Sequence, residues 1–158
     1  MFRKMRRANQ ALTDEERADV LTSQKRGVLS VIGDDGYPYG MPLNHMYCPE
    51  NGHIYFHGGK LGHRVDAVKA CDKVSYCVFD EGYRKDGEWA LNVRSVIVFG
   101  RMRPVEDEEE AVTICRRLSR RFTSDDDYIE DEIRRVGAAT LVLELIPEHI
   151  SGKLVNES

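Results

Sequence analysis

Short β-prone runs separated by Gly, Pro, Asn and Asp dominate the pattern of hydrophobic and polar positions along the chain. Such runs are typical of strands joined by turns. They predict strands over residues 28–32, 37–48, 53–57, 73–79, 89–102 and 138–146. Asp-Gly at 35–36 and the turn 49–52 predict hairpins between the first three. Pro147 is expected to end the last strand.

Four segments carry helical signals instead. Thr13 and Glu16 form a capping box, which predicts the start of the first helix. The clearest helix has an apolar stripe, an acidic first turn and a basic last turn. The predicted helices cover residues 13–24, 61–68, 107–122 and 126–136. The segment 89–102 has apolar residues on both faces, which implies burial on both sides. A barrel wall or a dimer interface would provide that burial.

Antiparallel strands with peripheral helices predict a mainly β (α+β) fold, a small barrel rather than a doubly wound sheet. The length of 158 residues suits one domain over 1–158, with a polar and flexible arm at 1–11. The net charge of −4 gives no drive toward nucleic acid or an anionic membrane. No apolar run approaches the ~20 residues that span a bilayer, and no signal peptide is evident, so we expect a cytoplasmic protein.

The cysteines and histidines do not suggest a metal centre. Four cysteines show no C-x-x-C spacing, and five histidines form no zinc-ligand motif. We therefore expect no metal site and mostly reduced cysteines.

The segment 57–64, HGGKLGHR, is the most informative for chemistry. It combines three glycines, a strand end, the start of a helix and the basic residues Lys60, His63 and Arg64. Exposed backbone amides at a helix start attract anions, and arginine can bind a phosphate through two hydrogen bonds. This pattern suits a phosphate group. The alternative is a glycine-rich turn with solvated basic side chains.

The segment 40–46, GMPLNHM, offers a second candidate site. Its proline, with Pro38 before it, leaves backbone groups unpaired along the strand. Those groups are available to the polar edge of a planar heterocycle. The alternative is an edge strand with a bulge.

The run GDDGYPYGMPLNHMYCPENGHIYFHGGKLGHR at 33–64, with SVIVFGRM at 95–102 and ISGK at 150–153, resembles a known family. It is similar to the FMN-binding split barrel of the pyridoxamine 5′-phosphate oxidase-like superfamily, and within it to the nitroimidazole-resistance (Nim-type) proteins. The resemblance implies a six-stranded antiparallel split β-barrel with peripheral helices. It also implies a homodimer that holds FMN at the subunit interface and acts as a flavin-dependent oxidoreductase.

The same resemblance implies a role for each matching residue. The substrate would be a small redox-active molecule, with NAD(P)H as a candidate electron donor. The arginine motifs that bind the vitamer phosphate are not found, so pyridoxamine phosphate is not the expected substrate. His57 is the expected catalytic side chain, as a hydrogen-bond donor or proton source. The expected cofactor-binding residues are Met41, Pro42, Leu43 and Asn44 along the ring, His57 and Gly58 near the ribityl chain, Lys60, His63 and Arg64 at the phosphate, Trp89 over the pocket, and Arg94 and Ser95 from the partner subunit.

Three alternatives differ in the bound group or in activity. A haem-binding or haem-degrading protein on the same fold could use His45 or His57 as an axial ligand. A non-catalytic flavin carrier or redox sensor would bind FMN without turnover. A small-barrel RNA binder is disfavoured by the acidic balance and by the lack of a basic face with interleaved aromatic residues.

Overall fold

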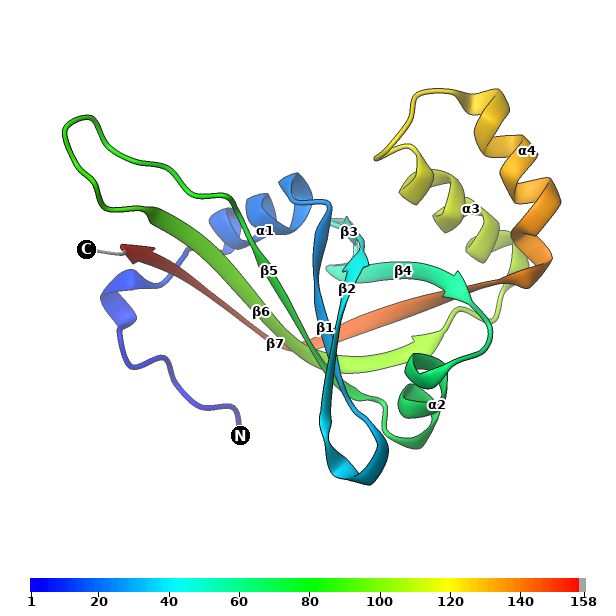
Figure 1. Cartoon of the computed structure of the whole chain (residues 1–158), viewed down its shortest axis with the longest axis horizontal. Coiled ribbons are helices and arrows are strands. Elements are labelled where there is room, and N and C mark those ends of the chain that lie inside the picture. The colour runs from blue at the N-terminus through cyan, green and yellow to red at the C-terminus, as the bar shows by residue number, and fades with distance from the viewer. Residues whose placement is uncertain (157–158) are drawn as a thin grey trace.

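The computed structural model describes residues 1–156, and its main feature is one curled antiparallel sheet (Figure 1). Seven strands form this sheet in the order β2-β1-β5-β6-β7-β4-β3. The strands are β1 (Arg26–Ile32), β2 (Pro38–Asn44), β3 (Met46–Cys48), β4 (His53–Gly59), β5 (Lys73–Phe79), β6 (Asn92–Pro104) and β7 (Thr140–Asn156). The helices are α1 (Asp14–Ser23), α2 (His63–Ala70), α3 (Glu108–Ser119) and α4 (Asp126–Val136).

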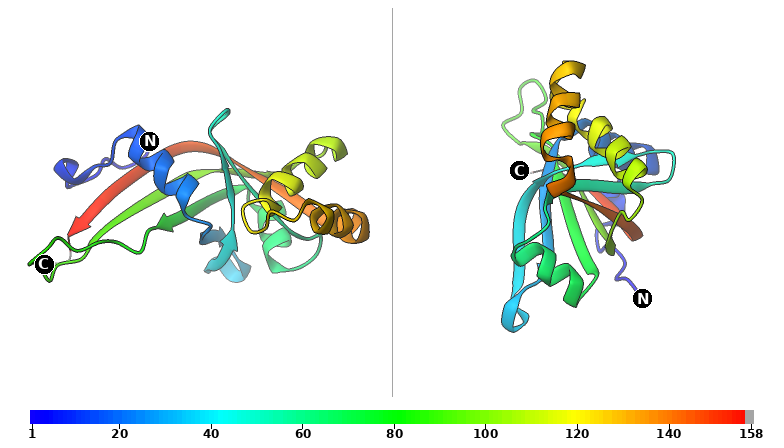
Figure 2. Two further views of the ribbon diagram at one scale, coloured as in Figure 1. Left: turned by 90° about the horizontal axis from the view of Figure 1, so that it is seen from above. Right: turned by 90° about the vertical axis from the view of Figure 1, so that its right-hand side faces the viewer.

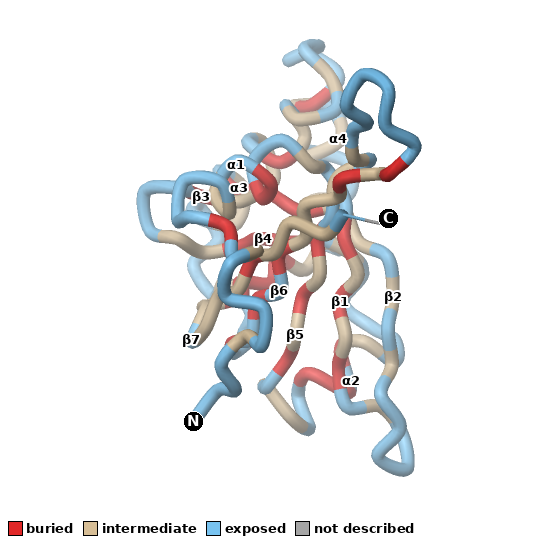
Figure 3. Tube along the Cα trace, turned by 90° about the vertical axis from the view of Figure 1, so that its left-hand side faces the viewer, coloured by how far each residue is buried: buried red, intermediate tan, exposed pale blue. Residues whose placement is uncertain are grey.

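The sheet curls into a half-barrel around the main core (Figures 1 and 2). Phe56 and Tyr76 pack edge to face at its centre, with ring centroids 4.9 Å apart. Buried positions alternate with intermediate or exposed ones along β1, β5 and β6, as Figure 3 shows. This alternation confirms the mainly β prediction, because each strand places one face toward the core.

The predicted strand 37–48 is two strands, so the expected number of six is wrong. The chain leaves β2 at one edge of the sheet and enters β3 at the other edge, with His45 between them. The His45 ring is fully buried, with Nε2 2.8 Å from the Leu21 carbonyl oxygen and Nδ1 2.9 Å from the Tyr76 hydroxyl. These partners hold the chain where it changes from pairing with β1 to pairing with β4.

The last strand does not end at Pro147, as the sequence suggested, but runs on to Asn156. The register between β6 and β7 shifts between Phe99 and Gly100, where Gly100 is the partner of Pro147. The shift leaves Glu148 as an extra residue on β7. Proline is tolerated at a bulge because the ladder hydrogen bond is interrupted there.

The predicted strand 89–102 begins later, at Asn92, and only one of its faces is buried. Val96 and Val98 are fully buried, whereas Ile97 and Phe99 remain 39% and 40% exposed. Two-sided burial is therefore wrong for the single chain. Trp89 lies before the strand, in the long connection from β5.

The helices occupy the positions that the sequence predicted, with ends that differ by a few residues. The Thr13–Glu16 capping box forms both of its hydrogen bonds. Helix α3 covers β3, β4 and β7 through Ile114 and Leu118, and α4 packs against α3 (Figure 1). None of the helices within residues 1–156 is long and apolar enough to cross a bilayer.

The predicted arm at 1–11 lies along β7. Ala8–Gln10 form a short 3-10 turn, and Ala11 makes a bridge to Lys153. The Phe2 ring stacks on His149 with centroids 4.9 Å apart.

Candidate ligand site at the β4–α2 junction

The chain turns sharply between β4 and α2, and this turn builds the candidate site. Gly62 precedes the helix with φ +119°, a conformation that residues with a Cβ rarely adopt. None of the described side chains caps the start of α2. The Val65 N–H donates to the Gly62 carbonyl oxygen over 2.9 Å, so the N–H groups of His63 and Arg64 are the ones available to a ligand.

The Arg64 side chain lies directly against Gly58. A Cβ at residue 58 would overlap the Arg64 Nη2 atom, so only glycine leaves room for the guanidinium. Within residues 1–156, Arg64 Nε is buried and has no hydrogen-bond partner. Burial lowers the pKa of this guanidinium, since the charged form loses solvation. An oxyanion bound here would supply the missing acceptor.

A cavity of about 330 Å³ lies beside His57, the histidine that feels the positive charge of Arg64. The last residues of β2 and the side chain of His57 line it, together with Arg26: the set is Arg26, Pro42, Leu43, Asn44 and His57. Arg26 Nε donates to Asn44 Oδ1 over 2.8 Å. Because β2 is an edge strand, one row of its backbone groups has no strand partner in the sheet. The structure thus brings together two segments that the sequence marked separately.

The surroundings of the His57 imidazole lower its pKa below the usual 6.5, which favours the neutral form. Burial lowers its pKa, and the positive charge of Arg64 lowers it further. A neutral imidazole has one N–H that donates and one nitrogen that accepts. His57 can therefore bind a polar ligand atom without adding charge to the cavity.

A second cavity, of about 790 Å³, adjoins the first and shares Asn44 and His57 with it. Lys60 also lines this larger cavity, whose other walls come from α3, α4 and the start of β7. Of the predicted residues, Asn44 and His57 thus lie where the two cavities meet, and Lys60 lies along the second cavity.

Other predicted residues point elsewhere. The His63 ring stacks on Tyr39 with centroids 4.2 Å apart, and its Nε2 is 3.7 Å from Asp34 Oδ2. It therefore packs against the β1–β2 turn. Met41 packs against the main core.

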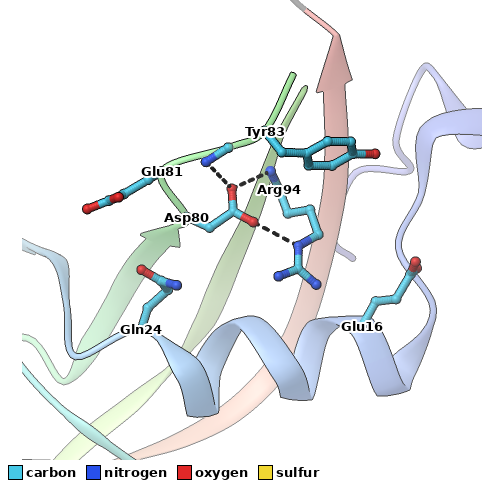
Figure 4. Close-up of a pocket in the computed structure, with 7 residues that line it drawn as sticks. Glu16, Gln24, Asp80, Glu81, Tyr83 and Arg94 are labelled. Atoms are coloured by element: carbon cyan, nitrogen blue, oxygen red, sulfur yellow. Dashed lines mark hydrogen bonds and ion pairs between the residues drawn. The ribbon is translucent and has the colours of Figure 1, made fainter. Parts of the chain in front are cut away.

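Arg94, Ser95 and Trp89 lie away from this site within one chain. Arg94 Nε donates to Asp80 Oδ2 over 2.8 Å and lines a separate pocket beside α1, drawn in Figure 4. Ser95 pairs with Phe79 in the sheet. Trp89 is 74% exposed. Contact of these residues with the cofactor would require a partner subunit.

The sequence interpretation missed Arg26. The β1–β2 register centres on Asp35, so that residues equally distant from it are partners, and Arg26 pairs with Asn44. Counting outward from a two-residue turn at Asp35-Gly36 would instead have placed Arg26 opposite His45, so the sequence signal alone did not give this pairing. The haem alternative loses His45, because both of its ring nitrogens are already bonded inside the core. No group of three or more His, Cys, Asp or Glu side chains within residues 1–156 is arranged to hold a metal ion.

Comparisons with known proteins agree with this architecture. No curated protein matches the chain. A candidate 5-nitroimidazole antibiotic resistance protein of Bacteroides thetaiotaomicron VPI-5482 superposes with a TM-score of 0.76 at 16% identity, over 92% of this chain and 87% of that one. An FAD-binding protein of Mesorhizobium loti superposes with a TM-score of 0.66 at 22% identity, over 92% of this chain and 97% of that one. An FAD- and haem-binding protein of Mycobacterium smegmatis superposes with a TM-score of 0.73 at 21% identity, over 94% of this chain and 74% of that one.

These identities are low, so the solved structures show a shared fold. The family assignment comes from a different comparison: the family model described as pyridoxamine 5′-phosphate oxidase matches residues 13–154. That range includes every strand and helix that builds the candidate site. The chain belongs to the pyridoxamine 5′-phosphate oxidase family.

Proposed function

We propose that this protein binds flavin mononucleotide and acts, as a homodimer, as a flavin-dependent oxidoreductase. The observation that carries the proposal is the Arg64 guanidinium, held over Gly58 with a buried Nε that has no partner within residues 1–156. Leaving a buried donor unsatisfied costs about 1–3 kcal/mol. A phosphate ester would bind this group, which explains why the fold retains it.

The surrounding residues fit such a ligand. Arg64, Lys60 and the free N–H groups of α2 would hold one phosphate group. The last residues of β2 and His57 would lie beside the ring system in the adjoining cavity. A single cluster of positive charge suits the one phosphate of FMN. When bound, the flavin supplies hydride and electron transfer.

His57 is the proposed catalytic side chain. It lines both cavities, so it lies where a cofactor and a substrate would meet. As a neutral imidazole it donates a hydrogen bond from its one N–H to a substrate oxygen, while the protons that the reduced product gains come from solvent.

Dimerisation is supported by the apolar outer face of β5 and β6. Phe79, Ile97 and Phe99 are 56%, 39% and 40% exposed on it. Several exposed apolar side chains on one face of a sheet favour an interaction site, although Phe2 already packs against Phe99 there. A partner subunit on this face would bring Trp89 and Ser95 toward the cofactor, whereas Arg94 points to the other face of the sheet, toward Asp19 of α1. The electron donor would be NAD(P)H, and the FAD-binding neighbours make FAD the main competing cofactor.

The test is the absorbance spectrum of the freshly purified protein, with the mass of the released cofactor. Flavin absorbance and the mass of FMN would support the proposal. The mass of FAD would show that the cofactor is FAD and not FMN. A haem spectrum would show that the bound group is haem and not a flavin. A colourless protein that takes up neither added FMN nor added FAD would contradict the proposal.

Activity is tested separately with the flavin-loaded protein. Bleaching of the flavin by NADH or NADPH, followed by recovery on adding an acceptor, would support an oxidoreductase. A loaded protein that no donor reduces would instead be a flavin carrier or sensor.

A further inference from the structure

The larger cavity is bounded by two helices and the sheet and has mainly apolar walls. Val112 on α3 faces Ile133 and Val136 on α4 across it, and Leu141 and Val142 of β7 also line it. Its volume of about 790 Å³ falls within the range of small-molecule sites.

Helix α4 leaves part of its apolar stripe uncovered. Ile129 is buried at 1% exposure, whereas Val136 and Tyr128 are 41% and 57% exposed. Phe122, just after α3, is 45% exposed and lines the same cavity. An amphipathic helix gains stability by burying its whole apolar stripe. The uncovered part faces a space that an apolar ligand could fill.

The polar groups at one end of this cavity are hydrogen-bond donors. His57 and Asn44 line both cavities, so they mark the junction with the proposed flavin site. Asn44 Oδ1 already accepts from Arg26, which leaves its Nδ2 group to donate. The neutral His57 ring supplies a second N–H. Two donors suit an oxygen acceptor such as a carbonyl.

The charges along the cavity disfavour an anion. Three carboxylates, those of Glu106, Glu108 and Glu132, line it against the single ammonium of Lys60. Like charges raise the cost of bringing an anionic ligand into a partly desolvated space. An uncharged ligand avoids that cost and gains from burial of its apolar surface.

We propose that this second cavity is the substrate site and that its substrates are uncharged, largely apolar molecules with a carbonyl group at one end. The His57 and Asn44 side chains donate hydrogen bonds to that carbonyl oxygen where the two cavities meet. The role of this cavity as a substrate site depends on the proposed flavin function, whereas the class of ligand depends on the walls and charges of the cavity itself. The experiment therefore measures binding without a cofactor.

The probe is 6-propionyl-2-(dimethylamino)naphthalene, an uncharged naphthalene with one carbonyl, whose emission shifts to the blue in apolar surroundings. Titrated into cofactor-free protein, it should bind saturably with a blue shift. The anionic probe 8-anilinonaphthalene-1-sulfonate should bind about tenfold more weakly. Equal binding of the two probes would overturn the proposed ligand class.

Variants of Val112 locate the probe. This side chain lines the cavity and is only half-buried, so V112W should fill the space and weaken uncharged-probe binding at least about tenfold. V112I, which keeps the wall apolar and adds one methylene, should bind within about twofold of the wild type. Circular dichroism checks that V112W folds, and V136D at an exposed position provides a second obstruction. Unchanged probe binding in both V112W and V136D would overturn the proposal.

Two further outcomes separate the competing explanations. If uncharged-probe binding weakens as protein concentration rises, a second copy of the chain covers the cavity, and the proposal is wrong. If V112W loses the probe but takes up FMN normally, the two sites are distinct, as proposed. Failure of FMN uptake by the wild type, with probe binding intact, would contradict the flavin function but leave the ligand class standing.

Discussion

Gly58 and Arg64 act as one unit, since the guanidinium occupies the space that a Cβ at residue 58 would fill. We expect Gly58→Ala to displace Arg64 and raise the dissociation constant for FMN about 10- to 100-fold, because a charge-assisted contact contributes about 1.5–3 kcal/mol. Arg64→Gln should have a similar effect. Quenching of FMN fluorescence during titration measures both.

Gly59→Ala is the matched control. A Cβ at residue 59 meets only the Leu61 carbonyl oxygen at 4.0 Å, which is ordinary contact distance. We expect its FMN affinity to stay within about twofold of the wild type. If Gly58→Ala and Gly59→Ala changed the FMN affinity equally, binding of the phosphate group would not depend on Arg64.

His45 is the buried titratable group whose protonation should matter for stability. Burial lowers its pKa from 6.5 to about 4. The unfolded chain therefore takes up this proton first as the pH falls below 6.5, and folding loses stability until the pH nears 4. At pH 5 this difference amounts to about 2 kcal/mol.

The NMR titration of the His45 imidazole tests this prediction directly. Its resonances should keep their neutral-form shifts through pH 6 and move only near pH 4. Urea unfolding at pH 7 and pH 5, compared between wild type and His45→Asn, should show a smaller pH-dependent loss in the variant. A midpoint near 6.5 would contradict the buried arrangement with Leu21 and Tyr76.

Among the elements, β6 and β7 approach each other closely at Gly100, beside the bulge that accommodates Pro147. A Cβ on Gly100 would overlap the Ile146 carbonyl oxygen, next to the bulge at Glu148. We expect Gly100→Ala to lower the free energy of unfolding by about 2 kcal/mol or more, since neither backbone can move freely. Urea denaturation measures the change.

Gly40→Ala on the edge strand β2 provides the comparison. Its Cβ would lie 3.5 Å from Val28 Cγ1, a normal contact. The free energy of unfolding should change by no more than about 0.5 kcal/mol. A large loss there, or none at residue 100, would argue against the bulged register.

For the molecule as a whole, the exposed face of β5 and β6 carries the dimer proposal. We expect Ile97→Lys to shift the protein from dimer to monomer and to weaken FMN binding, because burying an unpaired ammonium in an interface is costly. Light scattering after size-exclusion chromatography measures the mass. Ile97 is 39% exposed in the single chain, so folding should be retained.

Tyr37→Lys is a control on another exposed apolar side chain. Tyr37 is 75% exposed in the turn between β1 and β2, away from the β5–β6 face. Its mass and FMN affinity should match those of the wild type. A monomeric wild type that binds FMN fully would remove the proposed role of the partner subunit.

The local interactions could be predicted from the chain because they depend on residues close in sequence. The capping box of α1 and the hairpin at Asp35-Gly36 formed as expected. The family resemblance, which rests on ordered short motifs, was confirmed over residues 13–154. Each of these signals is either formed by residues close together in the sequence or read from the order of short motifs along the chain.

Contacts between distant segments could not be predicted in this way. The change of sheet edge at His45 depends on Leu21 and Tyr76, and Pro147 is tolerated because β6 shifts its register opposite it. The buried Arg64 Nε, which has no hydrogen-bond partner within residues 1–156, and the cavity lined by α3 and α4 likewise arise from packing across the fold. The sequence therefore determined the elements and their local turns. Burial and close approach between remote residues determined the site, because desolvation and steric fit depend on three-dimensional neighbours.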